Sequence, residues 1–131
     1  CFRDRVTMTP DKSPAGQAAM LLAKTAALAA DDRKAEHTLV LAVGEVLAIT
    51  DYFVITSAGN RRQVRSVVDA VEESVRTTLG RSPIRSEGVS EQQWVLLDYG
   101  DVVVHVFAED IRAYYEIERL YRDVARVPWQ D

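Results

Sequence analysis

The sequence predicts a mixed α/β fold, an α+β arrangement in which helices flank a mixed sheet. Two observations carry this prediction. Short, β-branched apolar runs alternate with longer segments of helical periodicity, and glycine, proline or asparagine marks most of the boundaries. The predicted order is α-β-β-α-β-β-α. The chain has 131 residues, which suits one domain. We assign residues 14–131 to that domain, and we interpret residues 1–13 as a flexible N-terminal leader or as residues that are not native to the protein.

Two helices have clear boundaries in the sequence. The first begins at Ser13, a good N-cap, with Pro14 at the first helical position, and it ends at Asp32. The second begins at Asn60, carries valines at helical spacing along one side, and ends before Gly80. These signals are local, so they predict the helix ends without knowledge of the fold.

The strands are predicted from short apolar runs. Residues 38–43, 51–57 and 102–108 are apolar on both alternations, so we expect them to be central and covered on both faces. Residues 93–98 are joined to 102–108 by Tyr99-Gly100, the spacing of a tight hairpin in which glycine can adopt positive φ. The remaining predicted elements are a short edge strand within the loop 81–90 and a last helix at 111–125.

Charge and cysteine content limit the classes of function. The net charge is −4, whereas a protein that grips nucleic acid through its phosphates usually carries a basic face. An acidic protein can still act beside RNA if its direct partner is a basic protein. The one cysteine, Cys1, permits no disulfide within the chain, and no segment resembles a membrane span or a signal peptide. We therefore expect a cytoplasmic protein without a membrane partner.

Residues that could carry catalysis are present but form no recognisable motif. Ser57, Asp51 and His105 are the residue types of a hydrolytic triad, yet Ser57 lies in TSAGN and not in GxSxG. A zinc site needs three or four ligands, and the chain has no cysteine pair. We interpret His105 as a hydrogen-bonded strand residue, and we predict no catalytic residue, no metal site and no cofactor.

Two acids and a basic cluster define an alternative function. Asp98 and Asp101 are expected to face each other across the hairpin turn, where turn chemistry or partner contact explains them better than a metal dyad. Arg61, Arg62 and Arg65 begin the second helix, where an anion could bind, although a solvated basic face explains them too and contact with rRNA stays open. Together these groups describe a nucleotide-binding or nucleotidyltransferase-like enzyme.

Two aromatic residues bracket the first strand of the hairpin. Large aromatics that stay partly exposed are favoured anchors of protein interfaces, but core burial explains Trp94 and Tyr99 equally well. The neighbouring acids Glu87, Asp98 and Asp101 favour the interface, because an apolar centre with an acidic rim suits a basic protein partner.

Several segments resemble one known family. They are DYFVI at 51–55, RQV at 62–64, EG at 87–88, WVLLDYGDVVVHVF at 94–107 and RAYYEIERLY at 112–121. These segments are similar to those of the ribosomal silencing factor family, also called the RsfS or Iojap family. The resemblance extends from about residue 15 to 124, and the stretch 94–107 is its most specific part.

The resemblance implies a function and a fold. Family members bind large-subunit ribosomal protein L-fourteen on the face that meets the small subunit, sterically block subunit joining and so repress translation under nutrient limitation. It also implies a nucleotidyltransferase-like fold without the catalytic site, no enzymatic activity, and a homodimer whose surface overlaps the ribosome-binding surface.

The resemblance places the partner contact on the first strand and turn of the hairpin, while residues 102–107 hold the sheet together. The implied contact set comprises Glu87, Gly88, Trp94, Leu96, Asp98, Tyr99, Gly100 and Asp101.

Overall fold

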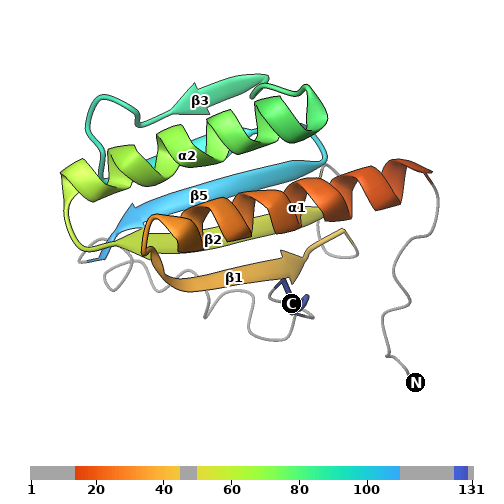
Figure 1. Cartoon of the computed structure of the whole chain (residues 1–131), viewed down its shortest axis with the longest axis horizontal. Coiled ribbons are helices and arrows are strands. Elements are labelled where there is room, and N and C mark those ends of the chain that lie inside the picture. The colour runs from red at the N-terminus through yellow and green to blue at the C-terminus, as the bar shows by residue number, and fades with distance from the viewer. Residues whose placement is uncertain (1–13, 45–49, 110–125, 130–131) are drawn as a thin grey trace.

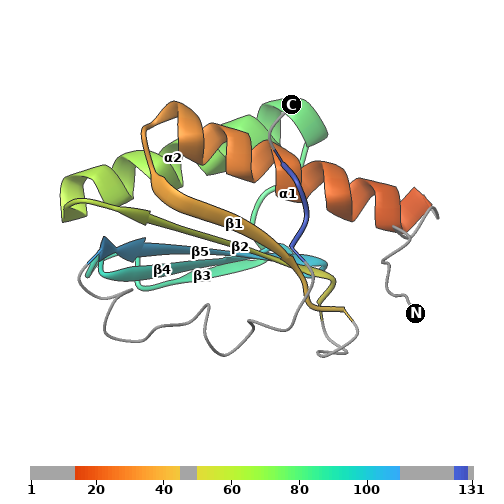
Figure 2. The same cartoon turned by 90° about the horizontal axis from the view of Figure 1, so that it is seen from below.

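The computed structural model describes residues 14–44, 50–109 and 126–129, and within them two helices cover one face of a five-stranded sheet. Figure 1 shows the helices side by side in front of the sheet, and Figure 2 shows both on the same side of it. The elements are α1 (Pro14–Asp32), β1 (Glu36–Ala42), β2 (Tyr52–Ala58), α2 (Arg61–Leu79), β3 (Arg85–Glu87), β4 (Trp94–Asp98) and β5 (Val102–Ala108).

The predicted elements of this region are confirmed, with small shifts at their ends. The described order is α-β-β-α-β-β-β, in which β3 is the short edge strand expected between the second helix and the hairpin. The last helix predicted at 111–125 and the leader 1–13 lie outside the described residues. Neither α1 nor α2 is long and apolar enough to cross a membrane.

The capping residues of α2 act as the sequence predicts. Asn60 has an extended backbone, and its Oδ1 accepts a hydrogen bond from the Gln63 backbone N–H at 2.8 Å. The Gln63 side chain reaches back to the Gly59 N–H at 2.9 Å, one residue before the position of a standard capping box. Gly80 ends the helix in the left-handed conformation.

The strand order corrects one expectation from the sequence. The order is β1-β2-β5-β4-β3, with β2 and β5 parallel and the other neighbours antiparallel. β2 and β5 are central, as expected, but β1 lies at an edge. Its apolar character fits a partly covered edge: Leu41 forms an isolated bridge with Arg126, and the Val127 N–H donates to the Val40 carbonyl at 2.8 Å.

Side chains on the two faces of the sheet belong to different clusters. On the inner face, residues such as Val54, Val104 and Leu97 pack with the helices in the main core. On the outer face, away from the helices, Phe53 and Phe107 belong to a second, smaller cluster. Because successive strand residues point to opposite faces, this division fixes which side chains of β4 can meet a partner.

Candidate functional site

Alternation along β4 places three residues of the predicted contact set on the outer face. Trp94, Leu96 and Asp98 are half-buried there, while Val95 and Leu97 between them are buried on the inner face. Glu87 of β3 pairs directly with Leu96 and is exposed, so it joins the same face. We call these four residues, Glu87, Trp94, Leu96 and Asp98, the β3–β4 surface.

Trp94 is held on two sides by residues of β5. Its indole stacks on its direct cross-strand partner Phe107, with ring centroids 4.9 Å apart. The indole Nε1–H donates a hydrogen bond to Nδ1 of His105 at 3.1 Å. Burial lowers the pKa of His105 to about 4, so the imidazole is neutral at pH 7 and its Nδ1 can accept.

Asp98 is fixed by two hydrogen bonds. Its Oδ1 accepts from the Gly100 N–H at 2.8 Å, and its Oδ2 accepts from Nε of Arg85 at 3.3 Å. The first bond is the side-chain to backbone turn contact that the sequence predicts for aspartate here. Arg85 lies directly opposite Asp98 on β3 and partly offsets its charge.

The turn lies one residue further along than predicted, which separates the two acids. The Tyr99 N–H donates to the Val102 carbonyl at 2.9 Å, so Gly100, with φ of 94°, and Asp101 form the centre of the turn. Asp101 pairs with Arg81 through two hydrogen bonds of 3.0 and 2.9 Å. The expectation that Asp98 and Asp101 face each other is therefore wrong: each carboxylate contacts its own arginine.

Tyr99 does not belong with the β3–β4 surface. The expectation that its side chain stays partly exposed is wrong, because Tyr99 is 1% exposed and packs in the main core beneath the helices. Tyr99 continues the series of alternate residues Val95 and Leu97, which point to the inner face. Burial raises the pKa of its hydroxyl to about 12.

Gly88 is positioned by packing against β4. Its φ is 78°, and a Cβ built on it would lie 2.1 Å from the carbonyl oxygen of Trp94. The backbone after β3 therefore approaches β4 more closely than any side chain allows, which gives Gly88 a structural reason to be glycine.

The basic cluster lies at the other end of the sheet from the acidic turn. Arg61, Arg62 and Arg65 are exposed at the start of α2, which follows the carboxyl end of β2, whereas Asp101 precedes the amino end of β5. The parallel strands β2 and β5 separate these groups by about 20 Å at roughly 3.3 Å per residue. Figure 1 shows the start of α2 and the start of β5 at opposite ends of the sheet, so the acids and arginines of the predicted nucleotide site do not converge.

The residues of the possible triad are separated in the same way. Asp51 lies just before β2, and Ser57 lies near the end of this strand. The Ser57 hydroxyl is buried and donates to the Glu36 carbonyl at 3.0 Å. In the described part of the chain, no group of three or more His, Cys, Asp and Glu residues could hold a metal ion.

A family model spans nearly the whole domain. It is described as "ribosomal silencing factor during starvation", and it matches residues 16–131. The chain belongs to the ribosomal silencing factor (RsfS) family.

Individual RsfS relatives agree with this assignment. The ribosomal silencing factor RsfS of Bacillus subtilis is 39% identical over 100 residues, which is 76% of this chain and 84% of the relative. A crystal structure from Chromobacterium violaceum superposes with a TM-score of 0.74 at 30% identity, covering 78% of this chain and 84% of that one. One from Bacillus halodurans has a TM-score of 0.72 at 35% identity, covering 83% and 98% respectively.

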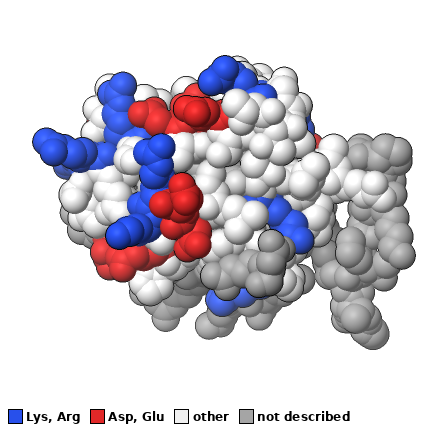
Figure 3. Space-filling view, viewed as in Figure 1, with Lys and Arg blue, Asp and Glu red and all other residues white. Residues whose placement is uncertain are grey.

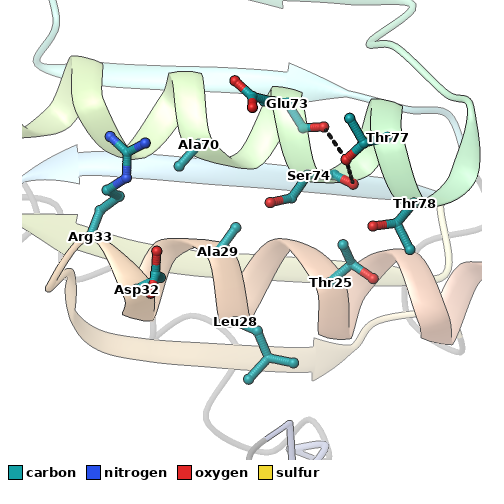
Figure 4. A pocket seen from close by; sticks show the side chains of 10 residues that line it. All are labelled: Thr25, Leu28, Ala29, Asp32, Arg33, Ala70, Glu73, Ser74, Thr77 and Thr78. Carbon is teal, nitrogen blue, oxygen red and sulfur yellow. Dashed lines mark hydrogen bonds between the residues drawn. The ribbon is translucent and has the colours of Figure 1, made fainter.

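The helix face of this RsfS chain carries an open groove of about 570 Å³ between α1 and α2. Small side chains such as Thr25, Ala29, Ala70 and Ser74 line much of it (Figure 4). The Thr77 hydroxyl at its rim donates within its own helix, to the Glu73 carbonyl at 2.9 Å. Basic and acidic side chains are interleaved on this face and form no single-sign patch (Figure 3). The groove lies on the opposite side of the sheet from the β3–β4 surface.

Sequence reasoning missed two arginines, Arg81 and Arg85, which pair with Asp101 and Asp98. The interpretation of His105 as a hydrogen-bonded strand residue is confirmed, because it lies in β5 and accepts from the Trp94 indole, but this partner was not predicted. A signal for His105 was available: it alternates with Phe107 on the strand that pairs with β4. The arginines gave no such signal, because their partners depend on the register of β3 and on the path of the chain after α2.

The buried hydroxyl of Tyr99 gives a first prediction. It has no hydrogen-bond partner among the described residues. We expect Tyr99→Phe to leave the free energy of unfolding unchanged or to raise it by about 1 kcal/mol, because an unpaired buried polar group is removed. Urea unfolding measures this change. Tyr99→Ala is the control and should cost about 3–5 kcal/mol. A clear loss of stability in Tyr99→Phe would show that the hydroxyl has a partner.

Proposed function

We propose that this chain binds the large ribosomal subunit through protein L-fourteen and sterically blocks joining of the small subunit. It acts by binding alone, without catalysis, and represses translation when nutrients are limiting. Membership of the RsfS family supports this proposal, since the family and its bacterial relatives carry the name ribosomal silencing factor.

The observation that carries the proposal is the convergence of Glu87, Trp94, Leu96 and Asp98 on one face. An aromatic anchor beside an aliphatic side chain supplies apolar area, and the exposed carboxylate of Glu87 favours a basic partner, whereas Arg85 partly offsets the charge of Asp98. The net charge of −4 acts in the same direction, because it steers a positively charged protein towards the chain.

The remaining members of the implied contact set take supporting roles in this proposal. Gly88 and Gly100 set the backbone path at the two ends of the surface. Asp101 and its partner Arg81 fix the turn, and Tyr99 anchors the turn from inside the core. This proposal needs no contact with rRNA, because the residues of the β3–β4 surface are acidic or apolar.

The test compares two substitutions on the β3–β4 surface with matched changes on the helix face. Leu96→Ala and Glu87→Arg remove an apolar contact and reverse a charge. Leu28→Ala on α1, at a side chain that is 42% exposed, and Glu73→Arg on α2 make the same chemical changes elsewhere. Affinity for purified protein L-fourteen and co-sedimentation with large subunits are measured for each, together with light scattering during subunit association.

We expect the double variant Leu96→Ala/Glu87→Arg to bind L-fourteen at least about tenfold more weakly, a loss of about 1.4 kcal/mol. It should no longer prevent subunit association at concentrations at which the wild type does. Leu28→Ala/Glu73→Arg should behave as the wild type. Equal binding by both double variants, with both folded, would place the contact elsewhere.

The free protein is proposed to form a homodimer through an overlapping surface. Sedimentation of the chain alone, and with increasing L-fourteen, distinguishes competition from independence. Competition predicts that the dimer disappears as the complex forms, whereas a dimer that persists within the complex would show that the two surfaces are separate.

A further inference from the structure

The orientation of the Trp94 indole depends on the acceptor of its N–H. Tryptophan has only two side-chain torsions, so an indole held in one orientation loses little entropy when a partner binds. A half-buried indole also carries an N–H that needs an acceptor, and apolar neighbours cannot provide one. The residue that supplies this acceptor therefore decides how the ring lies.

Two residues of β5, Phe107 and His105, hold the Trp94 indole by different contacts. Phe107, directly opposite Trp94, stacks against the face of the indole with an interplanar angle of 26°. His105, directly opposite Leu96, is the diagonal neighbour of Trp94 and reaches its Nε1–H with Nδ1 at 3.1 Å. Stacking alone would leave the ring free to slide or turn over, whereas the hydrogen bond fixes which edge points to β5.

His105 is itself held tightly. It is 5% exposed and lies between Ile55 of β2 and Leu96 of β4 in the sheet. The ring of Phe53 meets the imidazole edge to face, with centroids 4.7 Å apart. Because His105 is held between β2 and β4, the acceptor Nδ1 has a fixed position, and the hydrogen bond fixes the indole relative to these strands.

The protonation pattern agrees with this arrangement. With Nδ1 accepting from Trp94, the proton of the neutral imidazole is on Nε2, and this buried atom has no hydrogen-bond partner among the described residues. Within the described residues, the hydrogen bond of this imidazole is therefore the one that its Nδ1 accepts from Trp94.

We propose that His105 is a positioning residue, whose Nδ1 holds the Trp94 indole in the orientation in which it meets the partner protein. This inference rests on the proposed function, because it concerns the orientation of Trp94 within the β3–β4 surface. His105 does not itself contact the partner.

A measurement on the unaltered chain tests the hydrogen bond. In protein labelled with ¹⁵N, a scalar coupling between Nε1 of Trp94 and Nδ1 of His105 is expected across the bond. The chain has two tryptophans, and the second, Trp129, donates its Nε1–H to the Thr38 carbonyl at 3.1 Å, so it serves as an internal control without this coupling. Absence of the coupling for Trp94 would overturn the proposal.

Variants test the consequence for binding. His105→Phe keeps an aromatic ring without an acceptor, and we expect the Trp94 indole N–H to exchange with solvent at least about tenfold faster, with Trp129 unchanged. Affinity for L-fourteen should fall about tenfold. His105→Asn, which keeps an acceptor oxygen near the position of Nδ1, should recover much of both losses. The asparagine variant also keeps the test decisive if His105→Phe does not fold.

A double-mutant cycle separates positioning from general packing. Trp94→Phe has no indole N–H, so adding His105→Phe to it should not weaken binding further. Additive losses would contradict the proposal.

If the wild type binds neither L-fourteen nor large subunits, the proposed function fails while the coupling remains observable. If the wild type binds and His105→Phe binds equally well, only the positioning role is wrong.

Discussion

Gly88→Ala is expected to lower the free energy of unfolding by about 3 kcal/mol or more. Two effects add: a left-handed backbone costs a non-glycine residue roughly 1–2 kcal/mol, and the new Cβ would lie 2.1 Å from the carbonyl oxygen of Trp94. That oxygen belongs to the backbone of β4, so the overlap is relieved only by moving the strand. Urea unfolding measures the loss.

Gly80→Ala is the matched control for this prediction. Gly80 has a similar φ of 68°, but no atom lies within 4 Å of the place where its Cβ would be. It should show only the backbone penalty of roughly 1–2 kcal/mol. The difference between the two variants therefore isolates the close approach to β4. Equal losses would mean that the loop after β3 can move away from Trp94 at little cost.

The second large effect is a loss of stability on acidification that depends on His105. Its pKa is about 4 in the folded chain and near its ordinary value of 6.5 in the unfolded chain. Between these values the unfolded state binds more protons, so the free energy of unfolding falls as the pH falls from about 6.5 to 4. A difference of this size corresponds to about 3 kcal/mol. Urea unfolding at several pH values across this window measures the loss.

His105→Phe serves as the reference for the pH dependence, because it lacks the titrating group. Other groups titrate in the same range: burial raises the pKa of Glu72, which favours the folded state as the pH falls. Such contributions are common to both proteins and cancel in the difference between their profiles. Parallel profiles between pH 6.5 and 4 would show that His105 is not desolvated in the folded chain.

The pH dependence of stability and the positioning role both involve the imidazole of His105, whose Nδ1 accepts the Trp94 hydrogen bond. Protonation of Nδ1 would convert the acceptor of the Trp94 hydrogen bond into a donor. Because burial keeps His105 neutral, the indole stays fixed over the whole range of ordinary cellular pH. The same burial that makes the imidazole costly to protonate therefore keeps the β3–β4 surface in one arrangement.

Local signals in the sequence determined the elements and part of the site. The caps of α2 at Asn60 and Gly80 involve only neighbouring residues, so they could be predicted and are confirmed. The helix start at Pro14 and the hairpin between β4 and β5 were predictable for the same reason. Trp94 and Leu96 were named together only through the family resemblance, and alternation along β4 explains why they share one face.

Only the tertiary structure decided which face of β4 is covered and which strand lies at the edge. The burial of Tyr99 depends on helices that pack on the inner face, and the edge position of β1 depends on the pairing of β2 with β5, far apart in the sequence. The hydrogen bond between Trp94 and His105 requires the register of two strands. These features arise from long-range pairing and packing, so the sequence could propose the surface, but the hydrogen bond between Trp94 and His105 was decided only by the paired strands.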